Sequence, residues 1–395
     1  MFILLLSLIY IAFISLGLPD ALLGSAWPVM FPALDVPVSY AGVIAFIISA
    51  GTIVSSLNTT KVIRKFGTGK VTAFSTFITA VALLGFSVSS EFWMLLVWSI
   101  PCGLGAGAID AALNGYVAEH YSAKHMNWLH AFWGVGASIG PYIMSYSLIA
   151  KDSWQTGYII VGLIQMALAI VLFLTLPVWH KQPHLMTQQG ETQHVHLNIK
   201  EALRIKGVKY ILTAFFGYCA LEATAGLWAT SYLVLEKGID AESAAKWASL
   251  FYLGITGGRF LNGFVADRFG NKNMIRAGIS LVGVGICILF LPLEIELLAL
   301  AGLLVIGLGC APIYPSIIHE TPRSFGAENA QAIIGIQMAS AYLGTTLMPP
   351  LFGLIADYIS ISLYPLFLIL LMGLMLVMTE KLNHMQNKLK HQLNR

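Results

Sequence analysis

The chain has 395 residues, of which 57% are hydrophobic and only 10% are charged. Soluble domains carry about 25% charged residues, so this chain lacks the polar surface that folding in water requires, and we expect lipid to be its solvent. The formal net charge of +3 gives no indication of a nucleic-acid partner, and none is expected. The four cysteines lie apart in apolar runs, which indicates small core residues and no metal or cofactor site.

Apolar stretches recur along the whole chain. A membrane-spanning helix takes about 20 mostly apolar residues, and twelve stretches meet this requirement. In chain order they are 3–31, 40–57, 70–89, 92–118, 128–149, 155–179, 208–235, 243–266, 273–292, 295–318, 328–356 and 360–379. The first lacks the basic start and the cleavage site of a signal peptide and is too long for one, so it is predicted to be a membrane helix. The predicted fold class is an all-α membrane protein with twelve transmembrane helices.

One long link divides these stretches. Residues 180–207 are polar and basic, whereas most other links are short, so two six-helix bundles are predicted. The predicted domains are an N-terminal bundle at 1–179, a cytoplasmic linker at 180–207, and a C-terminal bundle with a cytoplasmic tail at 208–395. With the N-terminus inside, the Lys and Arg residues on the outer side are only Lys151, Lys237 and Lys246. This bias predicts a multi-pass protein of the plasma (cell inner) membrane with both termini cytoplasmic.

The two predicted bundles repeat each other in sequence. The basic link Lys65–Lys70 (KFGTGK) follows the second stretch, and Arg268–Lys272 (RFGNK) follows the eighth. The fourth and fifth stretches hold GLGAGAID and GVGASIGP, and the tenth holds GLGCAPIYP. A parallel repeat of two bundles with the substrate site between them is a common plan of secondary transporters.

These features resemble the major facilitator superfamily over the whole chain. Residues 263–272, GFVADRFGNK, match its G-x-x-x-D-R-x-G-x-K signature closely. The resemblance implies a gating role for the residues of this signature, which are Gly263, Asp267, Arg268, Gly270 and Lys272. In the first copy Arg64 stands where the aspartate would be and Thr60 replaces the glycine, which weakens the case for a gating charge pair in that half.

A narrower resemblance is to the fucose/galactose/glucose:proton symporter family. It rests on PDALLGSAWP in the first stretch, GAIDAALN in the fourth and HAFWGVG in the fifth. Asp20 and Asp110 fall on the two acidic positions of that family, and Asn114 falls on its asparagine. Asp110 is shorter than the glutamate often found there, and His130 and Trp133 stand where the fucose transporter presents amides. The resemblance implies proton-coupled symport of a hexose-like sugar by alternating access.

Three acidic residues fall inside predicted membrane helices, namely Asp20, Asp110 and Glu222. An ionised carboxylate at the bilayer centre costs about 2.5–3.5 kcal/mol, so such a group is expected to pair, to face water or to be protonated part of the time. No Lys or Arg is predicted near mid-depth, because Arg259 is placed at the cytoplasmic end of its helix. The three acids are therefore predicted to couple transport to protons, with sodium as an open alternative. Pro19, beside Asp20, is expected to bend the first helix.

The candidates for substrate binding are polar and aromatic side chains at mid-depth. A sugar is held by flat aromatic surfaces and by groups that donate and accept hydrogen bonds. The candidates are Asn114, His130, Trp133, Trp228, Tyr314 and Gln337. The partners expected are a small-molecule substrate, a coupling ion and the lipid bilayer, with the protein itself a monomer.

Two other functions fit part of the sequence. Gly136–Pro141 (GASIGP) partly resembles the glycine–proline signature of superfamily antiporters, so a proton-coupled drug or metabolite antiporter is an alternative, although the polar candidates argue against a lipophilic pocket. An intramembrane aspartyl protease also needs two membrane aspartates, but its Gly-x-Gly-Asp sequence is absent before Asp110. The chain is not expected to be an enzyme. The sequence leaves open the substrate, the coupling ion, the direction and the stoichiometry.

Overall fold

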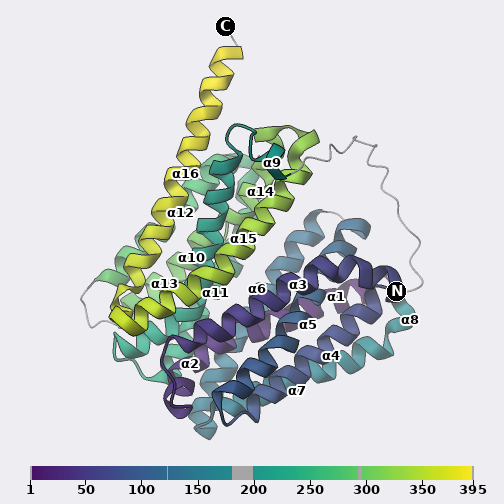
Figure 1. The fold of residues 1–395 in the computed structure, drawn as a ribbon, viewed down its shortest axis with the longest axis vertical. Helices are drawn as coiled ribbons and strands as arrows, with labels where there is room; N and C mark the ends of the chain where they lie inside the picture. The colour runs from purple at the N-terminus through teal and green to yellow at the C-terminus, as the bar shows by residue number, and fades with distance from the viewer. Residues whose placement is uncertain (1, 122, 180–198, 292–295, 394–395) are drawn as a thin grey trace.

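The computed structural model describes residues 2–121, 123–179, 199–291 and 296–393, and these residues are almost entirely helical (Figure 1). The helices are α1 (Phe2–Asp20), α2 (Leu22–Ala33), α3 (Tyr40–Phe66), α4 (Thr68–Ser87), α5 (Phe92–His120), α6 (Ala123–Lys151), α7 (Trp154–Leu174), α8 (Leu176–Trp179), α9 (Ile199–Ala202), α10 (Val208–Leu235), α11 (Ala241–Phe269), α12 (Asn271–Phe290), α13 (Glu296–Cys310), α14 (Ile313–Phe325), α15 (Ala327–Ile355) and α16 (Tyr364–Leu393). The short turns η1 (Ala356–Ser360) and η2 (Ile361–Leu363) join α15 to α16.

Every predicted apolar stretch overlaps a helix or a pair of helices, and α10 has the predicted bounds, Val208–Leu235. Among the described residues, nine stretches are both long and apolar enough to cross a membrane. One of them, Ala332–Lys388, contains most of α15 and α16, whereas the 29-residue helices α6 and α11 are not among the nine. The multi-pass helical character is thus confirmed, and the count of twelve spans stays a prediction. Most of the predicted linker, residues 180–198, lies outside the described residues.

The first predicted helix is broken in two. α1 ends at Asp20, Ala21 forms a turn, and α2 begins at Leu22. Pro19 lacks an N–H, so it leaves the Ser15 carbonyl without its helical partner. Gln165 of α7 fills that vacancy, because its Nε2 donates to the Ser15 oxygen at 2.7 Å. The break at Asp20 is therefore supported by a neighbouring helix, as freed carbonyls inside a membrane require. A second break, between α13 and α14, falls at Ala311 and Pro312.

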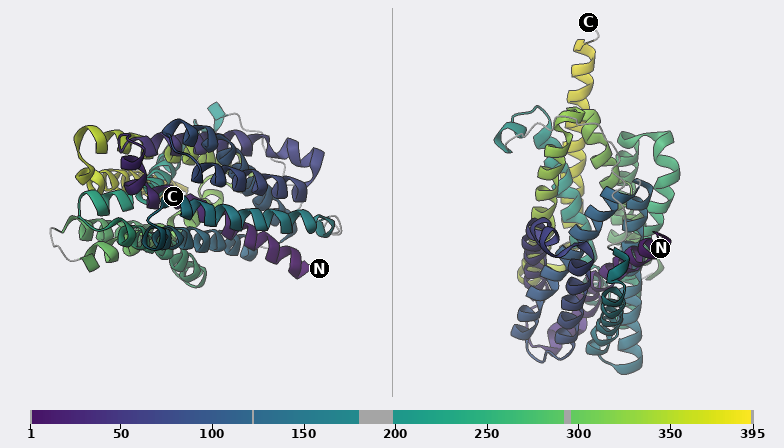
Figure 2. Two further views of the ribbon diagram at one scale, coloured as in Figure 1. Left: turned by 90° about the horizontal axis from the view of Figure 1, so that it is seen from below. Right: turned by 90° about the vertical axis from the view of Figure 1, so that its right-hand side faces the viewer.

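The helices of each half pack mainly among themselves. In the first half α1 packs on α6, α3 on α5, and α4 on both α5 and α7. In the second half α10 packs on α15 and α16, and α13 packs on both α11 and α12. Four pairs join the halves, namely α6 with α11, α3 with α15, and α2 with both α10 and α11. Figures 1 and 2 show the purple and blue helices on one side of the molecule and the teal to yellow helices on the other.

The halves approach each other closely at the end of the molecule that carries the α2–α3 and α15–α16 links. Ser39 Oγ donates to Asp357 Oδ2 at 3.0 Å across this boundary. A Cβ on Gly24 would lie 2.7 Å from the Leu227 carbonyl oxygen, and one on Gly42 would lie 2.6 Å from the Pro350 Cα. Only glycine permits such backbone contact between helices. We call this end the sealed end.

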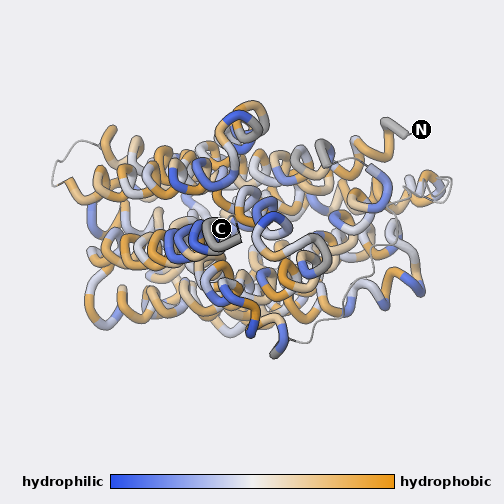
Figure 3. Tube along the Cα trace, turned by 90° about the horizontal axis from the view of Figure 1, so that it is seen from above, coloured by the Kyte–Doolittle hydropathy of each residue, from blue (hydrophilic) through white to orange (hydrophobic). Residues whose placement is uncertain are grey.

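The opposite end of the molecule is more polar and carries the end of α16. Figure 1 shows this helix, in yellow, projecting beyond the rest of the fold. Viewed along it in Figure 3, hydrophilic residues gather on its projecting part, while hydrophobic residues dominate most of the other helices. A surface that is apolar along its helices and polar at its end is typical of a protein whose solvent is lipid.

Candidate functional site

Asp20 is the last residue of α1 and is an exposed carboxyl between buried neighbours. Leu18, Ala21 and Leu22 are 4%, 2% and 0% exposed, respectively. The Asp20 Oδ2 accepts a hydrogen bond from Trp133 Nε1 of α6 at 2.7 Å. Trp133 also contacts Tyr252 and Arg259 of the second half, so Asp20 lies near the boundary between the halves.

Close packing of α1 on α6 brings Asp20 and Trp133 together. A Cβ on Gly17 would collide with the Trp133 carbonyl, and a Cβ on Gly136 would collide with the Ile14 carbonyl. These obstacles are backbone atoms, which cannot move aside as a flexible side chain can. The glycines of the first and fifth predicted helices therefore set the distance between the acid and the indole.

Arg259 of α11 lies in the same region and pairs with an acid. Its Nη2 is 3.6 Å from Glu222 Oε1 of α10, and the two side chains are 15% and 19% exposed. Its Nη1 donates to the His130 carbonyl at 3.4 Å, and its guanidinium lies 5.5 Å from the centre of the Trp133 ring. Cation–π contact of this kind is favourable within about 6 Å.

This arrangement differs from the sequence expectation that no Lys or Arg lies near the acids. The sequence places Arg259 at the cytoplasmic end of its helix, whereas in the structure its side chain reaches Glu222 of α10. The predicted proton-coupling acid Glu222 is consequently an ion-paired acid in this structure.

Asp20, Trp133, Arg259 and Glu222 form a continuous series of contacts, which we call the four-residue bridge. It runs from α1 through α6 and α11 to α10, and so joins the two halves. Tyr252 of α11 packs edge-on against Trp133, with ring centroids 6.4 Å apart. Trp133 is the one residue of the bridge that contacts both an acid of the first half and a cation of the second.

Asp110 and Asn114 lie one turn apart on α5 and are partly buried. Asn114 Nδ2 donates both to the Asp110 carbonyl oxygen, at 3.0 Å, and to the Asp110 Oδ1, at 2.9 Å. Asp110 interacts electrostatically with Asp20 of its own half and with Tyr314 and Tyr342 of the second half.

Two more of the predicted binding residues lie near the bridge. The His130 ring packs edge-on against Phe13, with centroids 5.8 Å apart, while its carbonyl accepts from Arg259. The Tyr314 hydroxyl donates to the Met338 sulfur at 3.5 Å, and the charge of Arg259 acts on it. Tyr218, which was not predicted, lies 6.2 Å from Tyr314 by ring centroids.

The structure does not bring Trp228 and Gln337 to the bridge. Trp228 is fully buried, donates from Nε1 to the Pro349 carbonyl at 2.9 Å and packs against Phe352 toward the sealed end. Gln337 is fully buried, and its Oε1 accepts from Thr321 Oγ1 at 3.1 Å. Both side chains lie in the core of the second half, and their role in substrate binding stays a prediction.

The predicted gating signature lies at the polar end. The surroundings of Gly263 and of the Asp267 side chain lie outside what the structure describes, whereas Arg268 is exposed. Gly270 has a φ of 76°, a backbone conformation that glycine adopts without strain. Lys272 Nζ donates to Gln386 Oε1 at 2.6 Å and lies 3.8 Å from Glu320 Oε1.

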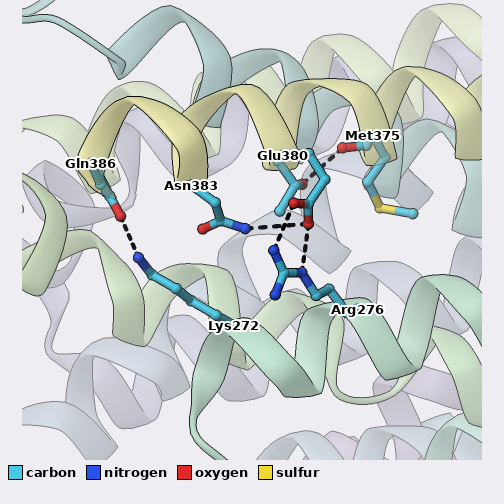
Figure 4. Close-up of polar contacts among 7 residues, drawn as sticks. Lys272, Arg276, Met375, Glu380, Asn383 and Gln386 are labelled. Carbon is cyan, nitrogen blue, oxygen red and sulfur yellow. Dashed lines mark hydrogen bonds and ion pairs between the residues drawn. The ribbon is translucent and has the colours of Figure 1, made fainter. Parts of the chain in front are cut away.

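One helical turn after Lys272, Arg276 donates two hydrogen bonds to Glu380 of α16, from Nε to Oε1 at 2.7 Å and from Nη2 to Oε2 at 2.6 Å (Figure 4). The start of α12 is thus tied to α16. The sequence carried one signal of this contact, because Glu380 is the first charged residue after the last apolar stretch.

A family model and several curated relatives match the chain. The family model of the Major Facilitator Superfamily matches residues 9–317 and 210–390. The chain is 23% identical over 314 residues to the glucose/mannose transporter GlcP of Bacillus subtilis (strain 168), covering 78% of this chain and 77% of that one. It is 24% identical over 318 residues to the cis,cis-muconate transport protein of Acinetobacter baylyi, covering 76% and 74%.

A yeast relative matches over a smaller share of its length. The chain is 22% identical over 281 residues to bypass of stop codon protein 6 of Saccharomyces cerevisiae, which is 66% of this chain and 56% of the yeast protein.

Solved structures share the fold at low sequence identity. A point mutant of the nucleoside transporter NupG superposes with a TM-score of 0.76 at 13% identity, over 96% of this chain and 98% of that one. An inward-facing, unoccupied bacterial homologue of the lysosomal transporter Spinster gives 0.75 at 11% identity, over 96% and 97%.

Proposed function

Because the chain belongs to the Major Facilitator Superfamily, we propose that it is a secondary active transporter that moves a hexose-like sugar together with protons by alternating access. In this proposal the chain crosses the plasma membrane twelve times in two six-helix bundles, with both termini in the cytoplasm. The gating signature at 263–272 then lies at the cytoplasmic face.

The observation that carries the proposal is the exposed Asp20 carboxyl at the break between α1 and α2. A carboxylate at this depth is costly in lipid, and function is the usual reason for one. Asp20 has a single hydrogen-bond donor, Trp133, and no described cation pairs with it directly. It is therefore free to gain and lose a proton in each cycle, with Asp110 as the neighbouring acid that exchanges with it.

The end of the molecule from which water can reach Asp20 supports alternating access. The halves meet through backbone contacts at the sealed end, where Ser39 binds Asp357. Water that reaches Asp20 then enters from the opposite end, which the charge bias assigns to the cytoplasm. The structure on this proposal is an inward-facing state.

Sugar recognition is assigned to the groups around Asp20. Trp133 offers an aromatic face, while Asn114, His130 and Tyr314 offer hydrogen-bonding groups. The glucose/mannose transporter GlcP, aligned over 78% of this chain, supports a hexose-like substrate. Trp228 and Gln337 are assigned a lesser part, because both are fully buried.

The test is uptake of labelled hexoses into proteoliposomes at several pH values, with and without sodium. We expect sugar uptake to acidify the lumen, and Asp20→Asn and Asp110→Asn to abolish the coupled proton movement. The matched control is Asp35→Asn, because Asp35 lies in the α2–α3 link at a positive φ of 50° that asparagine tolerates. Proton-coupled uptake that survives both Asp20→Asn and Asp110→Asn would rule out the proton-coupling role of these acids. Proton exit on substrate entry would instead establish the antiporter alternative.

A further inference from the structure

Arg259 is incompletely paired, and the same protein shows what complete pairing looks like. Arg276 binds Glu380 through two hydrogen bonds of 2.7 and 2.6 Å, although both side chains are about half exposed. Arg259, with a side chain only 15% exposed, has one contact of 3.6 Å to Glu222 and one of 3.4 Å to a carbonyl. A guanidinium carries several N–H donors in a rigid fork, so these two long contacts with described residues leave it room to bind a further acceptor.

The side chains around Arg259 are also donors without good acceptors. The Tyr218 hydroxyl is buried and makes no hydrogen bond of normal geometry, although it interacts with Glu222 and Arg259. The Tyr314 hydroxyl is directed at a methionine sulfur, which is a weak acceptor. Unsatisfied buried donors are costly, so this group is complementary to a ligand rich in acceptors.

We propose that the substrate is a sugar acid, a hexonate or hexuronate, whose carboxylate binds the Arg259 guanidinium in place of Glu222. This inference rests on the proposed sugar transport and specifies its substrate class. A carboxylate matches the guanidinium fork with two parallel hydrogen bonds, which neutral sugar hydroxyls cannot reproduce.

The displacement of Glu222 supplies a proton-coupled step. Before binding, the charges of Arg259 and Glu222 cancel. When the substrate carboxylate takes over Arg259, Glu222 loses its partner and the site holds one uncompensated negative charge. The coupling proton, which the proposed function assigns to Asp20 and Asp110, balances that charge, so the net charge of the site is unchanged. The groups that face Glu222 are Arg259 and Tyr252 on α11, Cys310 on α13, and Tyr218 and Cys219 on its own helix.

The experiment measures uptake of labelled glucose, gluconate and glucuronate by proteoliposomes that contain the full chain. We expect the acids to have a KM roughly tenfold or more below that of glucose, as charge-assisted hydrogen bonds imply. Arg259→Gln should remove this preference. Arg259→Lys should restore only part of it, because lysine keeps the charge but not the fork. The matched control is Arg323→Lys at the end of α14.

Because Arg259→Gln leaves Glu222 unpaired, the double substitution Arg259→Gln with Glu222→Gln serves as a second variant that contains no unpaired charge. In this variant the ratio of acid uptake to glucose uptake should fall to that of Arg259→Gln. Glu222→Gln alone should bind gluconate without releasing or taking up a proton.

The two proposals fail in different ways. The sugar-acid proposal is overturned if glucose and the acids are taken up equally and Arg259→Gln does not change the acid-to-glucose ratio. Hexose transport would then still stand. Uptake of none of the three compounds overturns both proposals.

Discussion

The Trp133 Nε1 donates to Asp20 Oδ2 at 2.7 Å, and the same indole ring lies 5.5 Å beneath the guanidinium of Arg259. One side chain of α6 thereby contacts an acid of the first half and a cation of the second. The hydrogen bond belongs to the edge of the ring and the cation contact to its face, so the two can be separated by substitution.

Trp133→Phe keeps an aromatic face for Arg259 and removes the donor to Asp20. Hydrogen bonds to charged groups contribute about 1.5–3 kcal/mol, so we expect proton-coupled uptake to fall roughly tenfold or more. The matched control is Trp93→Phe, because Trp93 donates to Glu91 at 2.6 Å in an exposed position outside the bridge. Equal uptake rates for the two variants in proteoliposomes would show that the Asp20 hydrogen bond has no part in coupling.

Arg259→Ala is expected to destabilise the protein by about 3 kcal/mol, since removal of one partner of a buried pair leaves the other uncompensated. Adding Glu222→Gln to Arg259→Ala should recover much of this loss. Thermal unfolding in detergent measures both effects, and a double-mutant cycle gives the coupling between the residues. Additive losses would show that the 3.6 Å contact does not stabilise the fold.

Gly136→Ala is expected to force α1 and α6 apart. The new Cβ would collide with the Ile14 carbonyl and lie 3.0 Å from the Leu18 amide nitrogen. Overpacking of this kind costs about 1–3 kcal/mol, and it should also weaken uptake by separating Asp20 from Trp133. The comparison is Gly373→Ala in α16, where nothing lies within 4 Å of the new Cβ. That variant should be as stable as the parent or more so by up to about 1 kcal/mol, and a similar loss in melting temperature for both would refute the packing argument.

Asp240 caps the start of α11 outside the membrane-spanning segments. Its Oδ2 accepts from the Ser243 amide at 2.8 Å, and this hydrogen bond lowers the pKa of the Asp240 carboxyl below its ordinary value. A lowered carboxyl pKa stabilises the fold above the pKa of the unfolded chain, near 4, and this contribution is lost as the pH falls below it.

Asp240→Ala should therefore cost about 1 kcal/mol at neutral pH and less at acidic pH. Asp240→Asn should retain most of the cap at neutral pH, because asparagine also accepts from the amide. Melting temperatures measured from pH 7 down to about pH 3 test this. A constant difference between the parent and Asp240→Ala across that range would exclude a charged cap.

The positions of the helices could be predicted because lipid allows few alternatives. A chain in a bilayer must satisfy its backbone within helices, so apolar runs and helices coincide, as at Val208–Leu235. Pro19 indicated the bend in the first helix, and the structure places the break two residues later. The break at Ala311 and Pro312 was not predicted, although the proline is visible in the sequence.

The rotation of each helix about its axis could not be predicted from the sequence. A helix that is apolar on all sides carries no pattern that distinguishes its buried face. Trp133 and Trp228 looked equivalent, yet one belongs to the bridge and the other is fully buried against Phe352. The pairing of Arg259 with Glu222 was missed because it depends on which faces of α10 and α11 meet, and that rotation is absent from the sequence pattern.

The break at Ala21 separates two rods with different attachments. α1 is fixed to α6 of its own half, whereas α2 lies against α10 of the other half. If the halves rock against each other as proposed, the angle between α1 and α2 would change at Ala21, next to Asp20. The charge on Asp20 would then act directly on the joint between a helix fixed to one half and a helix packed on the other.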